Sequence, residues 1–254
     1  DRNTPAHSRA SPMPDLSTSS ASIPSDVVEL QEKFTTSNPK NQLQMLPLLV
    51  DTGLTGIKVL IAWLQRQQGT KPTIVVGAVY QALYQSELSA ARDYLDRELP
   101  TGLVPLQSSV GIDYTQLQKL LAQQDFQAAD KLTTEKLCEL AGADAVKRKW
   151  IYFTEVEQLP TIDLHTIDTL WLLHSEGKFG FSIQREMWLG MGKNWDKLWP
   201  KIGWKEGNNW TRYPSSFTWN LTAPRGHLPL SNQLRGVRVI CSLLSHPAWE
   251  KVSS

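Results

Sequence analysis

The chain has 254 residues, a formal net charge of +1 and 20% charged residues. This balance excludes a bulk basic field, so we expect no nucleic-acid partner. Cys138 and Cys241 each stand in an apolar stretch, which argues against a disulfide framework and a cysteine-based zinc site. No apolar run approaches the roughly 18 residues that a membrane-spanning helix needs, and the start lacks a signal-peptide core. Composition therefore indicates a globular protein of a reducing compartment.

The first half of the chain predicts a tail followed by helices. Residues 1–25 are rich in Ser, Pro and Thr without apolar periodicity, and we expect a disordered tail, partly foreign to the native protein, with Met13 as a candidate start. Over 26–98, apolar residues recur at helical spacing in four stretches, the last running as one long helix from Pro72 to Leu95. This pattern predicts a compact N-terminal helical bundle.

A second helical unit is expected after a linker. Residues 99–111 contain two prolines and two glycines and predict the linker. Over 112–250, Asp113 and Asp125 are placed to open helices, because a carboxylate accepts the orphan N–H groups of a helix start. Further helices are predicted over 163–175, 182–190, 194–199 and 231–245. No strand-like alternation of useful length occurs, so the predicted fold class is all-α.

Tryptophan is the anomaly of the composition, because nine of the ten lie between Trp150 and Trp249. Trp171, Trp188 and Trp199 have helical spacing and are expected in the core. The stretch 203–229 lacks a helical period, and its length and aromatic content argue against both an ordinary connection and disorder. Its aromatic residues are Trp204, Trp210, Tyr213, Phe217 and Trp219. Either they form a mini-core under the loop, or some line a pocket for a flat apolar ligand.

Two arginines follow this aromatic stretch. Arg235 and Arg238 are three residues apart and would share one face of the helix predicted from Ser231. Residues 201–254 hold seven Lys or Arg against two Glu. Arginines at a pocket rim suit carboxylate groups of a ligand, while the alternative is an ordinary solvated face.

The sequence gives little support to catalysis. His165, His174, His227 and His246 show no metal-ligand or hydrolase spacing, and G-x-S-x-G, P-loop and G-x-G-x-x-G patterns do not occur. We expect these histidines to pack or cap, and we predict neither catalytic residues nor a metal site.

Four long strings carry a family resemblance: PTGLVPLQSSVGIDYTQLQKLL, WIYFTEVEQLPTIDLHTIDTLWLLHSEGKFGFSIQ, LWPKIGWKEGNNWTRYPSSFTW and APRGHLPLSNQLRGVRV. Through them residues 98–250 resemble the core domain of the genomes-uncoupled-four family, the tetrapyrrole-binding activators of magnesium chelatase. Residues 26–97 resemble the N-terminal bundle of cyanobacterial members.

The resemblance implies a helical "cupped hand" whose apolar concave groove binds protoporphyrin and magnesium protoporphyrin. It implies a non-enzymatic regulator of chlorophyll biosynthesis in photosynthetic organisms, with no cofactor of its own. The implied partner is the porphyrin-binding large subunit of magnesium chelatase. A monomer in the cytoplasm of a cyanobacterium, or in the chloroplast of a plant, is expected, with peripheral thylakoid association left open.

The resemblance also assigns binding residues. Matching positions are Phe153, Trp210, Tyr213, Trp219, Asn232, Arg235 and Arg238, and Phe217 joins them as an aromatic of the same loop. The chemistry agrees, because aromatic rings can cover an apolar macrocycle while arginines take its two propionates. Any one histidine could ligate a metal at the centre of such a ligand. The alternative function is a carbohydrate-binding module that uses the Trp-rich loop, which would imply a secreted, β-rich chain.

Overall fold

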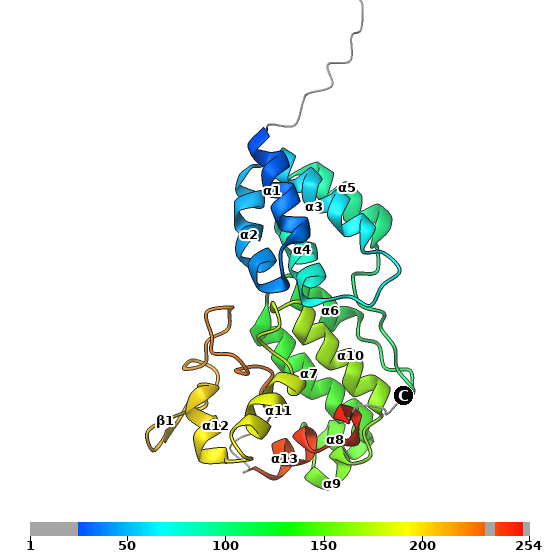
Figure 1. Ribbon diagram of the computed structural model, residues 1–254. Helices are drawn as coiled ribbons and strands as arrows, with labels where there is room; N and C mark the ends of the chain where they lie inside the picture. The colour runs from blue at the N-terminus through cyan, green and yellow to red at the C-terminus, as the bar shows by residue number, and fades with distance from the viewer. Residues whose placement is uncertain (1–24, 232–236, 251–254) are drawn as a thin grey trace, which may run out of the picture.

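The computed structural model describes residues 25–231 and 237–250 and is built almost entirely of helices (Figure 1). The helices are α1 Ser25–Thr36, α2 Pro39–Asp51, α3 Leu54–Arg66, α4 Ile74–Gln85, α5 Ser89–Glu98, α6 Thr115–Ala122, α7 Phe126–Ala141, α8 Ala143–Arg148, α9 Phe153–Val156, α10 Thr161–Leu173, α11 Phe181–Gly190, α12 Trp195–Lys201, α13 Arg238–Leu244 and the 3-10 turn η2 Pro247–Trp249. Strands β1 Lys205–Glu206 and β2 Asn209–Trp210 form a short antiparallel hairpin. The all-α prediction is confirmed, and none of the described helices is long and apolar enough to cross a bilayer.

The N-terminal helices surround their own apolar cluster, which includes Phe34, Leu60 and Val79. Local sequence starts these helices: the Asn38 side chain accepts a hydrogen bond from Asn41 N, and Thr73 caps α4 through Val76 N. The predicted long helix from Pro72 to Leu95 is wrong, because the backbone becomes extended at Ser86 and divides it into α4 and α5. This break lets α5 fold back to pack against α3 and α4.

The segment 99–111, predicted as a linker, is bound to α6 and α10 by side-chain hydrogen bonds. Gln118 accepts from Val104 N and donates to Thr101 O. Further along, the Ser109 N–H and hydroxyl both donate to the buried Asp163 carboxylate at 3.0 Å. The segment is therefore fixed in place over α6 and α10.

Helices α4 and α10 meet closely where the two halves join. A Cβ at Gly77 would lie 2.3 Å from Leu173 O, so only glycine permits this approach. Beside it, Gln81 Nε2 donates to Ala122 O at 2.5 Å, while His174 Nδ1 donates to Gln81 Oε1 at 3.0 Å. The contact is thus both sterically tight and joined by buried hydrogen bonds.

The second half packs around α10, and its apolar cluster includes all three tryptophans expected there, Trp171, Trp188 and Trp199. Trp171 stacks on Phe126 of α7 and donates through Nε1 to Thr133 Oγ1 at 3.0 Å. The predicted helix-opening role is confirmed for Asp125, whose carboxylate accepts from Ala128 N. The predicted helix over 231–245 starts later, because Ser231 is not helical and α13 begins at Arg238.

The stretch 203–229 contains the β1–β2 hairpin, which the sequence did not predict, followed by a series of turns. Buried contacts hold it against the body: Trp204 Nε1 donates to His227 O, and Gln184 Nε2 donates to Gly226 O and Pro229 O. The tryptophan stack, formed by Trp188, Trp195, Trp199 and Trp204, has successive ring centroids 4.8, 5.0 and 5.7 Å apart. The part of the loop near Trp204 is therefore an aromatic mini-core.

Candidate functional site

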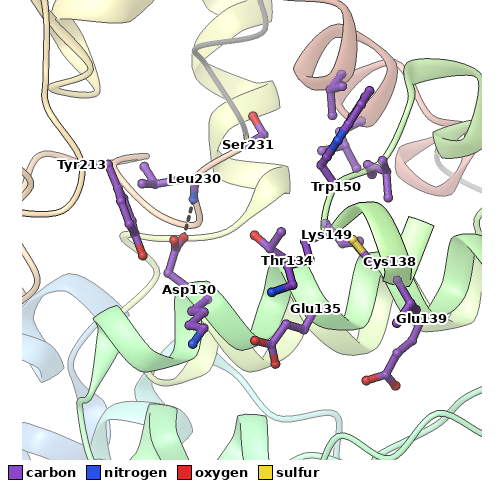
Figure 2. Close-up of a pocket in the computed structure, with 16 residues that line it drawn as sticks. Asp130, Thr134, Glu135, Cys138, Glu139, Lys149, Trp150, Tyr213, Leu230 and Ser231 are labelled. Carbon is purple, nitrogen blue, oxygen red and sulfur yellow. Dashed lines mark hydrogen bonds between the residues drawn. The ribbon is translucent and has the colours of Figure 1, made fainter. Parts of the chain in front are cut away.

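A cavity of about 640 Å³ opens between α7, the α8–α9 connection, the long loop and α13 (Figure 2). This volume lies in the range of small-molecule sites. The lining residues are Asp130, Lys131, Thr134, Glu135, Leu137, Cys138, Glu139, Val146, Lys149, Trp150, Ile151, Tyr213, Leu230, Ser231, Val239 and Leu243. Helix α7 forms the floor, and the walls come from three segments distant in sequence.

The floor carries one buried carboxyl group. Asp130 is 3% exposed, and its Oδ1 accepts a hydrogen bond from Leu230 N at 2.6 Å. Burial raises the pKa of Asp130 to about 7, and the Leu230 N–H, which favours the ionised form, offsets this only in part. Burial likewise raises the pKa of the Cys138 thiol to about 11, so this side chain is an unreactive apolar contact.

The α8–α9 connection forms an aromatic wall that an arginine holds in place. The Arg148 guanidinium donates to both oxygens of Glu155 at 2.7 Å and lies over the rings of Tyr152 and Trp150. Glu155 also accepts from Tyr152 N, which closes the first turn of α9. This network fixes the segment that runs from the cavity wall to Phe153.

Phe153 and Arg238, both predicted as ligand contacts, lie together beside this wall. The Arg238 guanidinium carbon is 5.4 Å from the centroid of the Phe153 ring, a cation–π distance. Arg238 opens α13, whose residues Val239 and Leu243 line the cavity. Asn232 and Arg235, which are also predicted as ligand contacts, lie outside the described residues.

The predicted loop aromatics have different surroundings. Tyr213 lines the cavity and is 49% exposed. Trp219 packs edge-on against Tyr213 and donates through Nε1 to Pro214 O. Phe217 is 5% exposed and packs against His227, while Trp210 lies edge-on to Trp199 and under Lys205. Most of these rings thus pack within the protein, whereas Tyr213 lines the cavity, and a ligand contact for the loop stays a prediction.

Each of the four histidines in the second half makes a hydrogen bond within the protein. His227 Nδ1 donates to Ile202 O, and its Nε2 accepts from Thr218 N. His246 accepts from Ala248 N, and burial lowers the pKa of His174 to about 4. Among the described residues, no group of three or more His, Cys, Asp or Glu side chains could hold a metal ion.

Sequence reasoning missed Asp130 and Ser231 as site residues. The helical pattern of α7 is defined by its apolar residues, so the sequence gives no reason to select the polar Asp130. Its hydrogen-bond partner Leu230 is 100 residues away. The apolar spacing predicts a helix from Ser231, whereas α13 begins only at Arg238. A local pattern could not have joined either residue to the cavity.

Fold and cavity together define an all-α protein with a cavity of small-molecule size. The chain belongs to the GUN4-like family: the family model matches residues 107–247, and residues 18–100 match the ARM-like repeat domain described as GUN4-N terminal. The family predicted from the sequence is therefore confirmed.

Relatives agree with this assignment. The chain is 52% identical to a Ycf53-like protein of Synechocystis sp., covering 89% of this chain and 97% of that one. It is 39% identical to a tetrapyrrole-binding protein of Arabidopsis thaliana chloroplasts, covering 52% of this chain and 54% of that one. The structure of GUN4 from Chlamydomonas reinhardtii superimposes with a TM-score of 0.55 at 43% identity, covering 58% of this chain and 95% of that one.

Proposed function

We propose that the protein binds protoporphyrin and magnesium protoporphyrin in the cavity above α7 and, in the bound state, activates magnesium chelatase for chlorophyll biosynthesis. The observation that carries the proposal is the cavity itself, whose lining combines apolar side chains such as Leu137, Ile151 and Leu243 with the aromatic rings of Trp150 and Tyr213. An apolar macrocycle gains affinity from such burial, at about 25 cal/mol per Å² of apolar surface before ordering costs.

The ligand contacts that we propose are the predicted ones. Tyr213 would contact the macrocycle in the cavity, with Phe217 and Trp219 supporting it and Trp210 extending the aromatic surface. Phe153 and Arg238, with Asn232 and Arg235, would form the polar edge that takes the propionates. The name of the Arabidopsis relative, a tetrapyrrole-binding protein, supports this ligand class.

We propose a regulator without catalytic activity of its own, whose partner is the porphyrin-binding large subunit of the chelatase. Residues 112–250 would form the binding domain, joined by 99–111 to the bundle at 26–98. The protein would act as a monomer where chlorophyll is made, in the cytoplasm of a cyanobacterium or in a chloroplast, with the thylakoid surface nearby. The carbohydrate-binding alternative loses support, because it implied a β-rich fold and Trp204 is fully buried.

The test combines binding with turnover. Quenching of porphyrin fluorescence by the full chain should saturate with protoporphyrin and with magnesium protoporphyrin. Purified chelatase should then insert magnesium faster when the protein is added, whereas the protein alone should leave protoporphyrin unmetallated. Absence of saturable quenching would reject the ligand, and quenching without faster insertion would reject the regulatory role.

A further inference from the structure

The cavity holds one buried carboxyl group among the described lining residues, that of Asp130. The other charged side chains of the lining, Lys131, Glu135, Glu139 and Lys149, are exposed. Water and salt screen those groups, whereas a buried charge acts on a ligand through a medium of low dielectric. Asp130 therefore dominates the electrostatics at its end of the cavity.

That end is separate from the end formed by Trp150, Lys149 and Cys138. Asp130 and Cys138 are eight residues apart on α7, about 12 Å along the helix axis. Figure 2 shows Asp130 beside Tyr213 and Leu230, with Trp150, Lys149 and Cys138 at the other end. Lys149 thus places a positive charge at the end of the cavity away from Asp130.

A second buried polar group in the cavity lining is the uncharged hydroxyl of Ser231. The Ser231 hydroxyl is buried in a residue that is 7% exposed, and it makes no hydrogen bond within the described part of the chain. Ser231 follows Leu230, whose N–H is fixed by the Asp130 carboxyl. This end can therefore take an uncharged ring edge, while a ligand carboxylate there would meet a buried like charge.

We propose that Asp130 is a specificity-determining residue, which excludes ligand carboxylates from its end of the cavity and so selects porphyrins whose carboxylates share one edge. This inference rests on the proposed function. Protoporphyrin carries its two propionates on one edge and can turn them away from Asp130. Coproporphyrin carries four propionates spread around the ring, so at least one faces the Asp130 end in any orientation.

The exclusion depends on the ionisation of Asp130. The groups near it are Lys131 and Glu135 of α7 and the Tyr213 phenol of the loop, whose own pKa is raised by burial and by the Asp130 charge. The Leu230–Ser231 segment donates its Leu230 N–H to the carboxyl and carries no charged or titratable side chain. Because burial raises the pKa of Asp130 to about 7, the carboxyl is mostly neutral in mild acid and mostly ionised in mild alkali. Discrimination against coproporphyrin should therefore grow as pH rises.

The experiment measures the ratio of dissociation constants, coproporphyrin over protoporphyrin, by fluorescence titration of the full chain at about pH 5.5 and about pH 8.5. In the unmodified protein this ratio should rise at least about fivefold between the two pH values. Asp130→Asn should lower the ratio by about tenfold at the higher pH and remove its pH dependence. Asp93→Asn, which removes an exposed carboxylate of α5, should behave like the unmodified protein.

Asparagine keeps an oxygen that can accept the Leu230 N–H, so the anchor is retained. Equal ratios in Asp130→Asn and the unmodified protein would overturn the inference while protoporphyrin binding stands. Failure of the unmodified chain to bind protoporphyrin would instead overturn the proposed function. If the variant does not fold, the unmodified protein decides alone, because a ratio that stays constant with pH contradicts the inference.

Discussion

The Arg238 guanidinium lies over the ring of Phe153 at 5.4 Å and thereby joins the first turn of α13 to the start of α9. The two helices also pack against each other. In this pairing the ring orients the guanidinium, so the cation and the aromatic face would meet a ligand as one unit.

This pairing predicts that Phe153 and Arg238 act together. Phe153→Ala and Arg238→Ala should each weaken protoporphyrin binding by about tenfold, since each removes about 1–2 kcal/mol of contact. The double variant should lose less than the sum of the two, by about 0.5 kcal/mol or more, because each single change already breaks the pair. Fluorescence titration of the four proteins gives this cycle, with Phe153→Tyr as the control that keeps the ring. Strict additivity would contradict the coupling.

The loop aromatics should differ in their effect on binding. Tyr213→Ala should weaken protoporphyrin binding by about tenfold, because the ring lines the cavity and aromatic burial contributes about 1–2 kcal/mol. Trp210→Ala should weaken it less, since Trp210 is engaged by Trp199 and Lys205 and lies outside the described lining. Absorbance titration of both variants measures the difference. The opposite order would place the ligand on the hairpin instead of in the cavity.

The close approach of α4 to α10 should be sensitive to a single methyl group. Gly77→Ala should lower the free energy of unfolding by about 1–3 kcal/mol, because the new Cβ meets the Leu173 backbone and the helices must separate. Gly190→Ala is the matched control, because Gly190 is also helical and has open space around its Cβ position. That control should be neutral or stabilising by up to about 1 kcal/mol. Urea denaturation measures the free energy of unfolding of both variants. Equal values would show that α4 and α10 accommodate the added methyl group without loss of stability.

The buried Asp130 carboxyl should make stability depend on pH. Its pKa rises from 3.8 to about 7 on folding, so between these values the native state holds a proton that the unfolded state has released. The contribution of Asp130 to the free energy of unfolding therefore falls as pH rises from about 4 to about 7, by up to about 1.4 kcal/mol per pH unit, and is constant above. Urea denaturation at several pH values gives the free energy of unfolding of the unmodified protein and of Asp130→Asn. The value for the unmodified protein minus that for the variant should fall as pH rises. If this difference instead rises with pH, the buried carboxyl is ionised throughout the range, which contradicts the prediction.

Periodicity predicted the fold class and most helices, because core contacts such as those of Trp171 recur at helical spacing. It failed at Ser86, because apolar spacing continues across the break while the backbone does not. It also failed for the cavity floor, since Asp130 gains its role from Leu230, a partner fixed only by tertiary structure. Phe153 and Arg238 could be selected from sequence, but their contact could not.

The Gln81 hydrogen bond connects the N-terminal helices to the end of α6, just before the helix that forms the cavity floor. Gln81 holds Ala122, the last residue of α6, and three residues later Asp125 starts the helix that forms the cavity floor. Pulling α4 away would strand buried polar groups, at a cost of about 1–3 kcal/mol for each one left unpaired. The position of the N-terminal helices is therefore linked, through one hydrogen bond, to the turn from which the cavity floor begins.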